Sequence, residues 1–99
     1  MATHPNEVIR VHMWVQGRVQ NVGFRAHIEY HALQIGVLGW VRNMGPDTVE
    51  TVAEGTRIQI DQFIEMVKRG PRASCIDQAR VEYEPTTEQL AGFDVKRSM

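Results

Sequence analysis

The sequence lacks several features that would point to particular classes of protein. Its single cysteine, Cys75, rules out an internal disulfide and with it a secreted disulfide scaffold. No run approaches the roughly 20 apolar residues that a membrane-spanning helix needs. Residues 1–7, MATHPNE, have neither the basic region nor the apolar run of a signal peptide. We therefore expect a cytoplasmic protein in which residues 1–7 form a flexible N-terminus.

Strong charge of either sign is also missing. The net charge is −1, and acidic and basic residues are mixed along the chain, so no global field favours nucleic acid or an anionic membrane. A length of 99 residues suits one domain, which can bury a modest core without metal or disulfide support. We expect a single domain over residues 1–99, a monomer without nucleic-acid or membrane partners. Any bound anion must be attracted by a local site.

Alternating apolar residues predict the strands. The clearest case is residues 8–16, where Ile9, Val11, Met13 and Val15 fall on one face. The sequence MGPD should turn the chain, so the strands on either side of it are predicted to form a hairpin. The further predicted strands are residues 37–43, 48–54, 79–84 and 92–97.

Two segments have the period of amphipathic helices. The first is residues 24–35, ended by Gly36. The second follows Thr56 and Gln59, which have the spacing of a capping box, and it ends at Gly70. The order β-α-β-β-α-β, with strands that are apolar on one face only, predicts an α+β ferredoxin-like sandwich. Its antiparallel sheet would carry both helices on one face.

The segment GRVQNVGFR, residues 17–25, joins the first strand to the first helix and contains no obvious nucleophile or carboxylate. The first amides of a helix lack intrahelical partners, and the helix dipole favours an anion there. A glycine-bearing turn can aim further N–H groups at the same point, and Asn21 readily accepts a left-handed conformation. Arg25 lies in the first helical turn, where a cation opposes the dipole. From the loop alone, anion binding and a purely structural turn are about equally supported.

These residues also carry a resemblance to a known family. GRVQNVGFR, followed by GWVRN at residues 39–43 and VETVAEG at residues 49–55, strongly resembles acylphosphatase, whose signature is a G-x-V-Q-G-V-x-F-R loop and a G-W-V-x-N strand end. The resemblance runs from about Val8 to the final strand and includes GPRASCIDQARV at residues 70–81. It implies the ferredoxin-like fold. It also implies hydrolysis of the carboxyl–phosphate bond of acyl phosphates to a carboxylate and inorganic phosphate, without metal or other cofactor.

The resemblance also implies roles for individual residues. Arg25 matches the residue that binds the phosphoryl group, and Asn43 matches the catalytic residue that positions the attacking water. Asn21 stands where the family usually has glycine, and the turn MGPDT, residues 44–48, replaces a D-G turn. The loop expected to bind the substrate through its amides consists of Gly17, Arg18, Val19, Gln20, Asn21, Val22 and Gly23.

Other residues suggest weaker alternatives. His27 and His31 are spaced to bind a metal, but no third ligand is evident, so a packed or solvent-facing pair is favoured. Trp14 and Trp40 would suit base stacking on an open sheet, yet the aromatic-rich signature of RNA binders is absent.

The remaining polar residues predict little chemistry. The carboxylates show no pairing suited to acid–base work and are expected on solvated faces, His12 is expected at the surface, and Cys75 is expected to be half-buried. The leading hypothesis is a free-standing acylphosphatase. The alternative is a non-catalytic anion-binding or regulatory module of the same fold.

Overall fold

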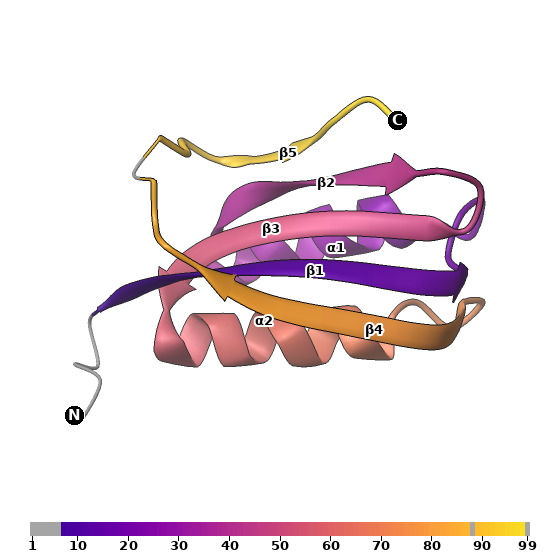
Figure 1. Ribbon diagram of the computed structural model, residues 1–99, viewed down its shortest axis with the longest axis horizontal. Coiled ribbons are helices and arrows are strands. Elements are labelled where there is room, and N and C mark those ends of the chain that lie inside the picture. The colour runs from indigo at the N-terminus through magenta and orange to yellow at the C-terminus, as the bar shows by residue number, and fades with distance from the viewer. Residues whose placement is uncertain (1–6, 88, 99) are drawn as a thin grey trace.

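The computed structural model describes residues 7–87 and 89–98, so most of the expected flexible N-terminus, residues 1–7, lies outside the described residues. The predicted β-α-β-β-α-β order is confirmed, with a short fifth strand after it (Figure 1). The elements are β1 Val8–Arg18, α1 Phe24–Ile35, β2 Leu38–Met44, β3 Thr48–Thr56, α2 Arg57–Arg69, β4 Cys75–Glu84 and β5 Phe93–Val95.

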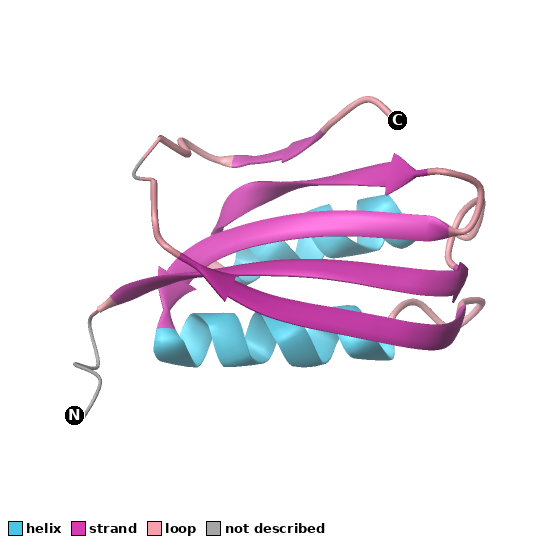
Figure 2. Cartoon of the chain, viewed as in Figure 1, coloured by secondary structure: helices cyan, strands magenta, loops and turns pink. Residues whose placement is uncertain are grey.

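The strands form one sheet in the order β4-β1-β3-β2-β5. β1 pairs antiparallel with both β3 and β4, and β2 pairs antiparallel with β3. β5 adds a parallel pair at the edge beside β2, so the whole sheet is mixed. Both helices lie on the same face of the sheet (Figure 2). The ferredoxin-like fold that the sequence predicts is therefore confirmed.

The core lies between the helices and the sheet. Val11, Met13 and Val15, the inward face of β1, are completely buried and belong to one cluster with Ile28 of α1 and Phe63 of α2. Burying such side chains stabilises the fold by about 1.5–3 kcal/mol each. The alternation over residues 8–16 thus decides which face of β1 meets the helices.

The helix ends are fixed by the residues that the sequence singles out. The Thr56 side chain accepts a hydrogen bond from the Gln59 amide at 3.3 Å, and the Gln59 side chain accepts one from the Thr56 amide at 2.9 Å, so the capping box is confirmed. Gln59 also donates to the Ile35 carbonyl, which ties α2 to the end of α1. The Gly36 amide closes α1 on the Ala32 carbonyl. Neither helix of the described chain has the length and apolarity to cross a membrane.

The predicted strand 79–84 begins earlier than expected, at Cys75. The added residues are mostly exposed, so no apolar alternation marks them. Cys75 itself is exposed, which corrects the half-buried position expected for it. Beside it, a bulge between Gln16 and Gly17 shifts the register of β1. Any Cβ at Gly17 would collide with the Cys75 carbonyl, so this close approach requires glycine.

The face of the sheet opposite the helices carries a network of paired charges. Arg10 donates to Glu54 at 3.0 Å and to Glu84 at 3.1 Å. The Thr87 amide donates to the same Glu54 carboxylate at 3.2 Å. Glu54 is only 4% exposed, so the expectation that the carboxylates lie on solvated faces is wrong here. Its burial is tolerated because hydrogen bonds compensate the charge.

The network continues through His12, which is part-buried and not simply at the surface. Its Nδ1 lies 2.7 Å from Glu84 and its Nε2 lies 2.7 Å from Glu50. Glu50, 5% exposed, also accepts a hydrogen bond from Arg42 and is the second carboxylate that departs from the solvated-face prediction. The His12 ring stacks on Trp14 at 3.9 Å between ring centroids. We name these charged residues the outer-face network: Arg10, His12, Arg42, Glu50, Glu54 and Glu84.

Candidate active site

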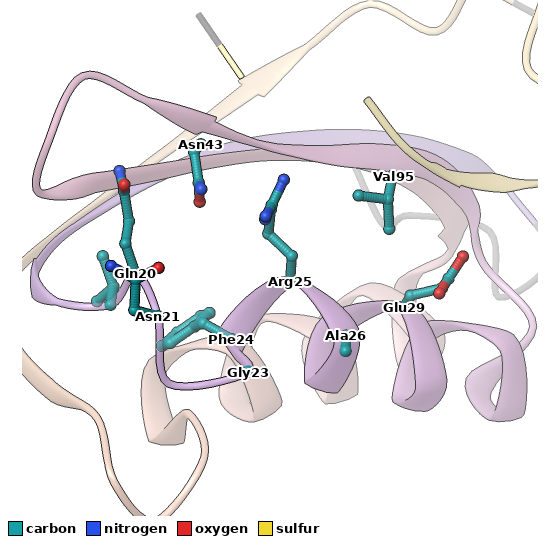
Figure 3. A pocket seen from close by; sticks show the side chains of 10 residues that line it. Gln20, Asn21, Gly23, Phe24, Arg25, Ala26, Glu29, Asn43 and Val95 are labelled. Carbon is teal, nitrogen blue, oxygen red and sulfur yellow. The ribbon is translucent and has the colours of Figure 1, made fainter. Parts of the chain in front are cut away.

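A pocket of about 280 Å³ opens where the β1–α1 loop meets the start of α1 and the ends of β2 and β5 (Figure 3). The loop supplies one end of it, and β2 supplies Asn43 from above the helix. β5 and the second turn of α1 supply the other end. The residues that line it are Val19, Gln20, Asn21, Gly23, Phe24, Arg25, Ala26, Glu29, Asn43 and Val95.

The part of the loop that lines this pocket has unused backbone donors. Gly23, the N-cap of α1, is left-handed at φ 75°, and Asn21 is left-handed at φ 61°, as its residue type predicts. The first helical hydrogen bond runs from the His27 amide to the Gly23 carbonyl. Among the described residues, the amides of residues 20–23 have no acceptor. Such a cluster of N–H groups at a helix N-terminus is suited to bind an anion.

Not all of the predicted loop reaches the pocket. The Gly17 amide donates to the Asp47 carbonyl at 2.9 Å, and the Val19 amide donates to the Gly17 carbonyl at 3.0 Å. These two amides are therefore occupied, although Val19 still lines the pocket. Arg18 belongs to β1 and is exposed, and Val22 packs against the core. The structure does not bring Gly17, Arg18 or Val22 to the pocket lining.

The Gln20 side chain joins the loop to the β2–β3 hairpin. Its Nε2 donates to the Gly45 carbonyl at 2.6 Å and to the Thr48 carbonyl at 3.0 Å. The sequence predicted only a backbone role for Gln20. The side-chain role was missed because both acceptors are backbone carbonyls, which residue type does not reveal. They lie 25 and 28 residues further along the chain.

The hairpin is also fixed from the β1 side. Asp47 accepts hydrogen bonds from the side chains of Gln16 at 3.0 Å and Thr48 at 3.1 Å. These two bonds, the one from Gln16 first, lower the pKa of Asp47 below its usual value. Together with the bond between Gly17 and the Asp47 backbone, they hold the MGPDT turn in one position relative to the loop.

Arg25 is half-buried in the first turn of α1, and its guanidinium extends toward the side of the pocket formed by Asn43 and Val95 (Figure 3). Glu29 lies four residues further along the same helix and lines the same pocket, yet the two side chains form no ion pair. No other described carboxylate pairs with Arg25 either. A planar guanidinium without a protein partner is suited to bind two oxygens of a phosphoryl group.

Asn43 lies near the end of β2, opposite Val49 of β3, and its side chain points into the pocket (Figure 3). Its Oδ1 is buried and has no hydrogen-bond partner among the described residues. Buried polar atoms are usually paired, so an unpaired acceptor in a pocket indicates a place for water or a ligand. A carboxamide is not a useful base, but its oxygen can accept a hydrogen bond and so orient a water molecule.

The two histidines of α1 lie in a separate groove between the helices. The rings of His27 and His31 are 4.5 Å apart at their centroids. Burial lowers the pKa of His27, and the nearby His31 lowers it further. Within residues 7–87 and 89–98, no group of three or more side chains of the metal-binding types comes together.

Comparison with known proteins gives a consistent result. The sequence pattern of the acylphosphatase family matches residues 11–95. The chain is 44% identical over 96 residues to an acylphosphatase of Trichormus variabilis, which covers 97% of this chain and 94% of the relative. The crystal structure of an acylphosphatase from Bacillus subtilis superposes with a TM-score of 0.84 at 32% identity, over 89% of this chain and 98% of that one. An acylphosphatase structure from Coxiella burnetii also gives 0.84, at 31% identity, over 92% and 94% of the two chains.

Proposed function

Because this chain belongs to the acylphosphatase family, it is a hydrolase of acyl phosphates, and we propose that the pocket around Arg25 and Asn43 is its active site. One observation carries the proposal. Unpartnered loop amides, an unpaired guanidinium and an unsatisfied amide oxygen converge on one cavity. Each of these groups lacks a partner within the described protein. An acyl phosphate together with its attacking water would supply a partner for every one of these groups.

The phosphoryl group is held by the loop and Arg25. Within the predicted loop of residues 17–23, the pocket-lining residues with free amides are Gln20, Asn21 and Gly23, and these amides are the ones left to bind its oxygens. Donors that are already fixed in place stabilise the transition state without reorganisation. Phosphoryl transfer depends mainly on such positioning and charge stabilisation.

The leaving group needs no help from an acid. It departs as a carboxylate whose parent acid has a pKa of roughly 4, so it need not be protonated in the transition state. The bond that breaks joins phosphorus to the carboxyl oxygen, and the electron pair leaves with that oxygen. The reaction therefore has no step for which a general acid is required.

Asn43 orients the nucleophile. Its unpaired Oδ1 accepts a hydrogen bond from a water molecule and holds it in line with the leaving oxygen. The water proton passes to the phosphate itself, since the amide is not a base. Gln20 supports this geometry as a positioning residue, because it fixes the loop that holds phosphate relative to the hairpin that follows Asn43.

The proposal is tested by assaying hydrolysis of acetyl phosphate and benzoyl phosphate with a metal chelator present. We expect undiminished turnover with chelator, and competitive inhibition by inorganic phosphate. Binding of phosphate without turnover of either compound would contradict the proposal and favour a non-catalytic anion-binding module. Loss of activity in chelator would contradict the metal-independent mechanism.

We further propose, from the composition and the resemblance, that the protein is a cytoplasmic monomer that needs no cofactor. Sedimentation or size-exclusion chromatography at micromolar concentration would test the monomer. Fractionation of cells that express the protein would test the location.

A further inference from the structure

We propose that Glu29 makes the pocket select against acyl phosphates whose acyl group carries a second negative charge, in favour of small acyl groups that are neutral or carry an N–H donor. The inference rests on the proposed function, since it assigns the acyl group to one end of the same pocket. It begins from the position of Glu29, one helical turn beyond Arg25.

The pocket has two chemically different ends (Figure 3). Gln20, Asn21 and Asn43 surround one end, and Glu29 and Val95 lie at the other. Arg25 extends between them. The first end offers hydrogen-bond donors and an acceptor for water, whereas the second offers an aliphatic wall and a carboxylate. Only the first end suits a phosphoryl group.

In-line displacement decides where the acyl group lies. The attacking water and the leaving oxygen stand on opposite sides of the phosphorus atom. If Asn43 holds the water, the acyl group leaves away from Asn43, toward the end formed by Glu29 and Val95. The acyl group therefore meets the Glu29 carboxylate.

The Glu29 carboxylate forms no ion pair with the neighbouring cation, Arg25. Arg57 and Asp61 of α2 have the same spacing and order as Arg25 and Glu29, and they form an ion pair at 3.3 Å. Arg25 and Glu29 form no such pair, although both line the pocket. Glu29 is half-buried, which weakens the screening of its charge by solvent. An anionic acyl group is repelled there, and an N–H group can donate to the carboxylate.

The test compares kcat/KM for acetyl phosphate and succinyl phosphate, which share the reacting bond but differ by a distant carboxymethyl group that carries the second negative charge. In the wild-type protein we expect acetyl phosphate to be preferred. In Glu29→Gln we expect kcat/KM for succinyl phosphate to rise on the order of 5-fold more than that for acetyl phosphate. Carbamoyl phosphate, with its N–H donors, is expected to lose relative to acetyl phosphate in the same variant.

Glu65→Gln is the matched control. Glu65 lies on α2, is exposed and does not line the pocket, so this variant removes the same charge without touching the acyl end. We expect the acetyl-to-succinyl ratio to stay close to the wild-type value. A general increase in attraction for anions would favour the more highly charged succinyl phosphate in both variants. The difference in ratio between Glu29→Gln and Glu65→Gln therefore isolates the local effect of Glu29.

Salt provides a second reading. Raising the ionic strength should lower the acetyl-to-succinyl ratio of kcat/KM in the wild-type protein, because salt screens the repulsion between Glu29 and the succinyl carboxylate. The ratio should change less in Glu29→Gln, which lacks this repulsion. An unchanged ratio in Glu29→Gln, or an equal change in Glu65→Gln, would overturn the selectivity while leaving the proposed function intact. No turnover of either substrate by the wild-type protein would overturn both.

Discussion

The two faces of the sheet use charged side chains in opposite ways. On the outer face, Arg10 contacts two carboxylates, and His12 contacts a carboxylate through each ring nitrogen. On the helix side, Arg25 has no described carboxylate partner, and the Asn43 Oδ1 has no described partner of any kind. Both regions contain part-buried polar groups. Only one of them supplies its own partners.

This difference is what we expect between polar groups that stabilise a fold and polar groups that bind a ligand. Buried charges are tolerated when hydrogen bonds compensate them, so the outer-face network needs no ligand to be stable. A site for a ligand must instead leave its donors and acceptors unpaired and pointing at a common cavity. Composition alone would make the outer face the stronger candidate for a ligand site, because it carries more charged residues. The pairing of those charged residues with one another makes the pocket on the helix side the stronger candidate instead.

The largest effect is expected from Arg25→Lys. A lysine keeps the charge but loses the planar pair of donors, so kcat/KM for acetyl phosphate should fall roughly 100- to 1,000-fold. The melting temperature should stay close to that of the wild-type protein, because Arg25 has no described ion pair to lose. Arg57→Lys, at an exposed pair on α2, is the control and should keep full activity. Near-normal turnover in Arg25→Lys would remove Arg25 from the active site.

Asn43→Ala should lower kcat by about 100-fold, since a misplaced nucleophile has a cost of that order. The inhibition constant for inorganic phosphate should change less than about twofold, because the loop amides and Arg25 remain. Steady-state kinetics with phosphate as inhibitor measure both quantities. A large loss of phosphate binding would assign Asn43 to the phosphate and not to the water.

Glu54→Gln tests the other face. Removing one charge from a buried pair should lower the free energy of unfolding by about 2 kcal/mol. For a domain of this size that corresponds to a fall in melting temperature of roughly 8–16 °C. The kcat/KM of the folded protein should not change. Glu82→Gln removes an exposed partner of Arg80 and should have a much smaller effect. If Glu54→Gln altered activity while sparing stability, the contrast between the two faces would be wrong.

Gln20→Met keeps the length of the side chain but removes both donors to the hairpin. We expect kcat to fall about 10-fold through misplacement of Asn43 relative to the phosphate. In the double variant with Asn43→Ala, this loss should largely disappear, because the residue that Gln20 positions is gone. Additive losses in the cycle would show that Gln20 acts independently of Asn43.

The smallest expected effect is on the free energy of unfolding at low pH. Hydrogen bonding by His12 above all, with a further bond from Arg10, lowers the pKa of Glu84 below its usual value of 4.5, although partial burial opposes this. A lowered carboxyl pKa contributes stability above the usual value, and that contribution is lost as the pH falls through the folded-state pKa. Urea unfolding between pH 6 and 3 should therefore show a decline that is shallower in Glu84→Gln. Equal slopes in both proteins would contradict this role of Glu84.

Much of the fold was predictable because local patterns carry it. The alternation of β1 and the Thr56 capping box each depend on residues that are close together in the sequence, and the structure confirms both. The first part of β4 was not predicted as strand, because its exposed residues show no alternation of apolar and polar side chains. The burial of Glu50 and Glu54 escaped because their compensating partners lie on other strands. Arg10 and Glu54, for example, are 44 residues apart.

The site was predictable only in part. The glycine-bearing loop by itself favoured anion binding no more than a plain turn, and the roles that we propose for Arg25 and Asn43 came from the resemblance. Which amides remain available depends on the hairpin, since the Asp47 carbonyl takes the Gly17 donor. The position of Glu29 in the pocket could likewise be seen only in the three-dimensional structure. Nothing in its neighbours along the chain distinguishes it from a solvated helix residue.

The short strand β5 has a consequence for which compounds fit. It joins the sheet through only three residue pairs, anchored by the buried Phe93, and it places Val95 against the pocket. Edge segments with so few contacts detach at far lower cost than the whole domain unfolds. Detachment of β5 would move Val95, one of the residues that line the cavity, away from it. We therefore expect β5 to limit the size of the acyl group that fits, and we expect this limit to relax with rising temperature before the whole domain unfolds.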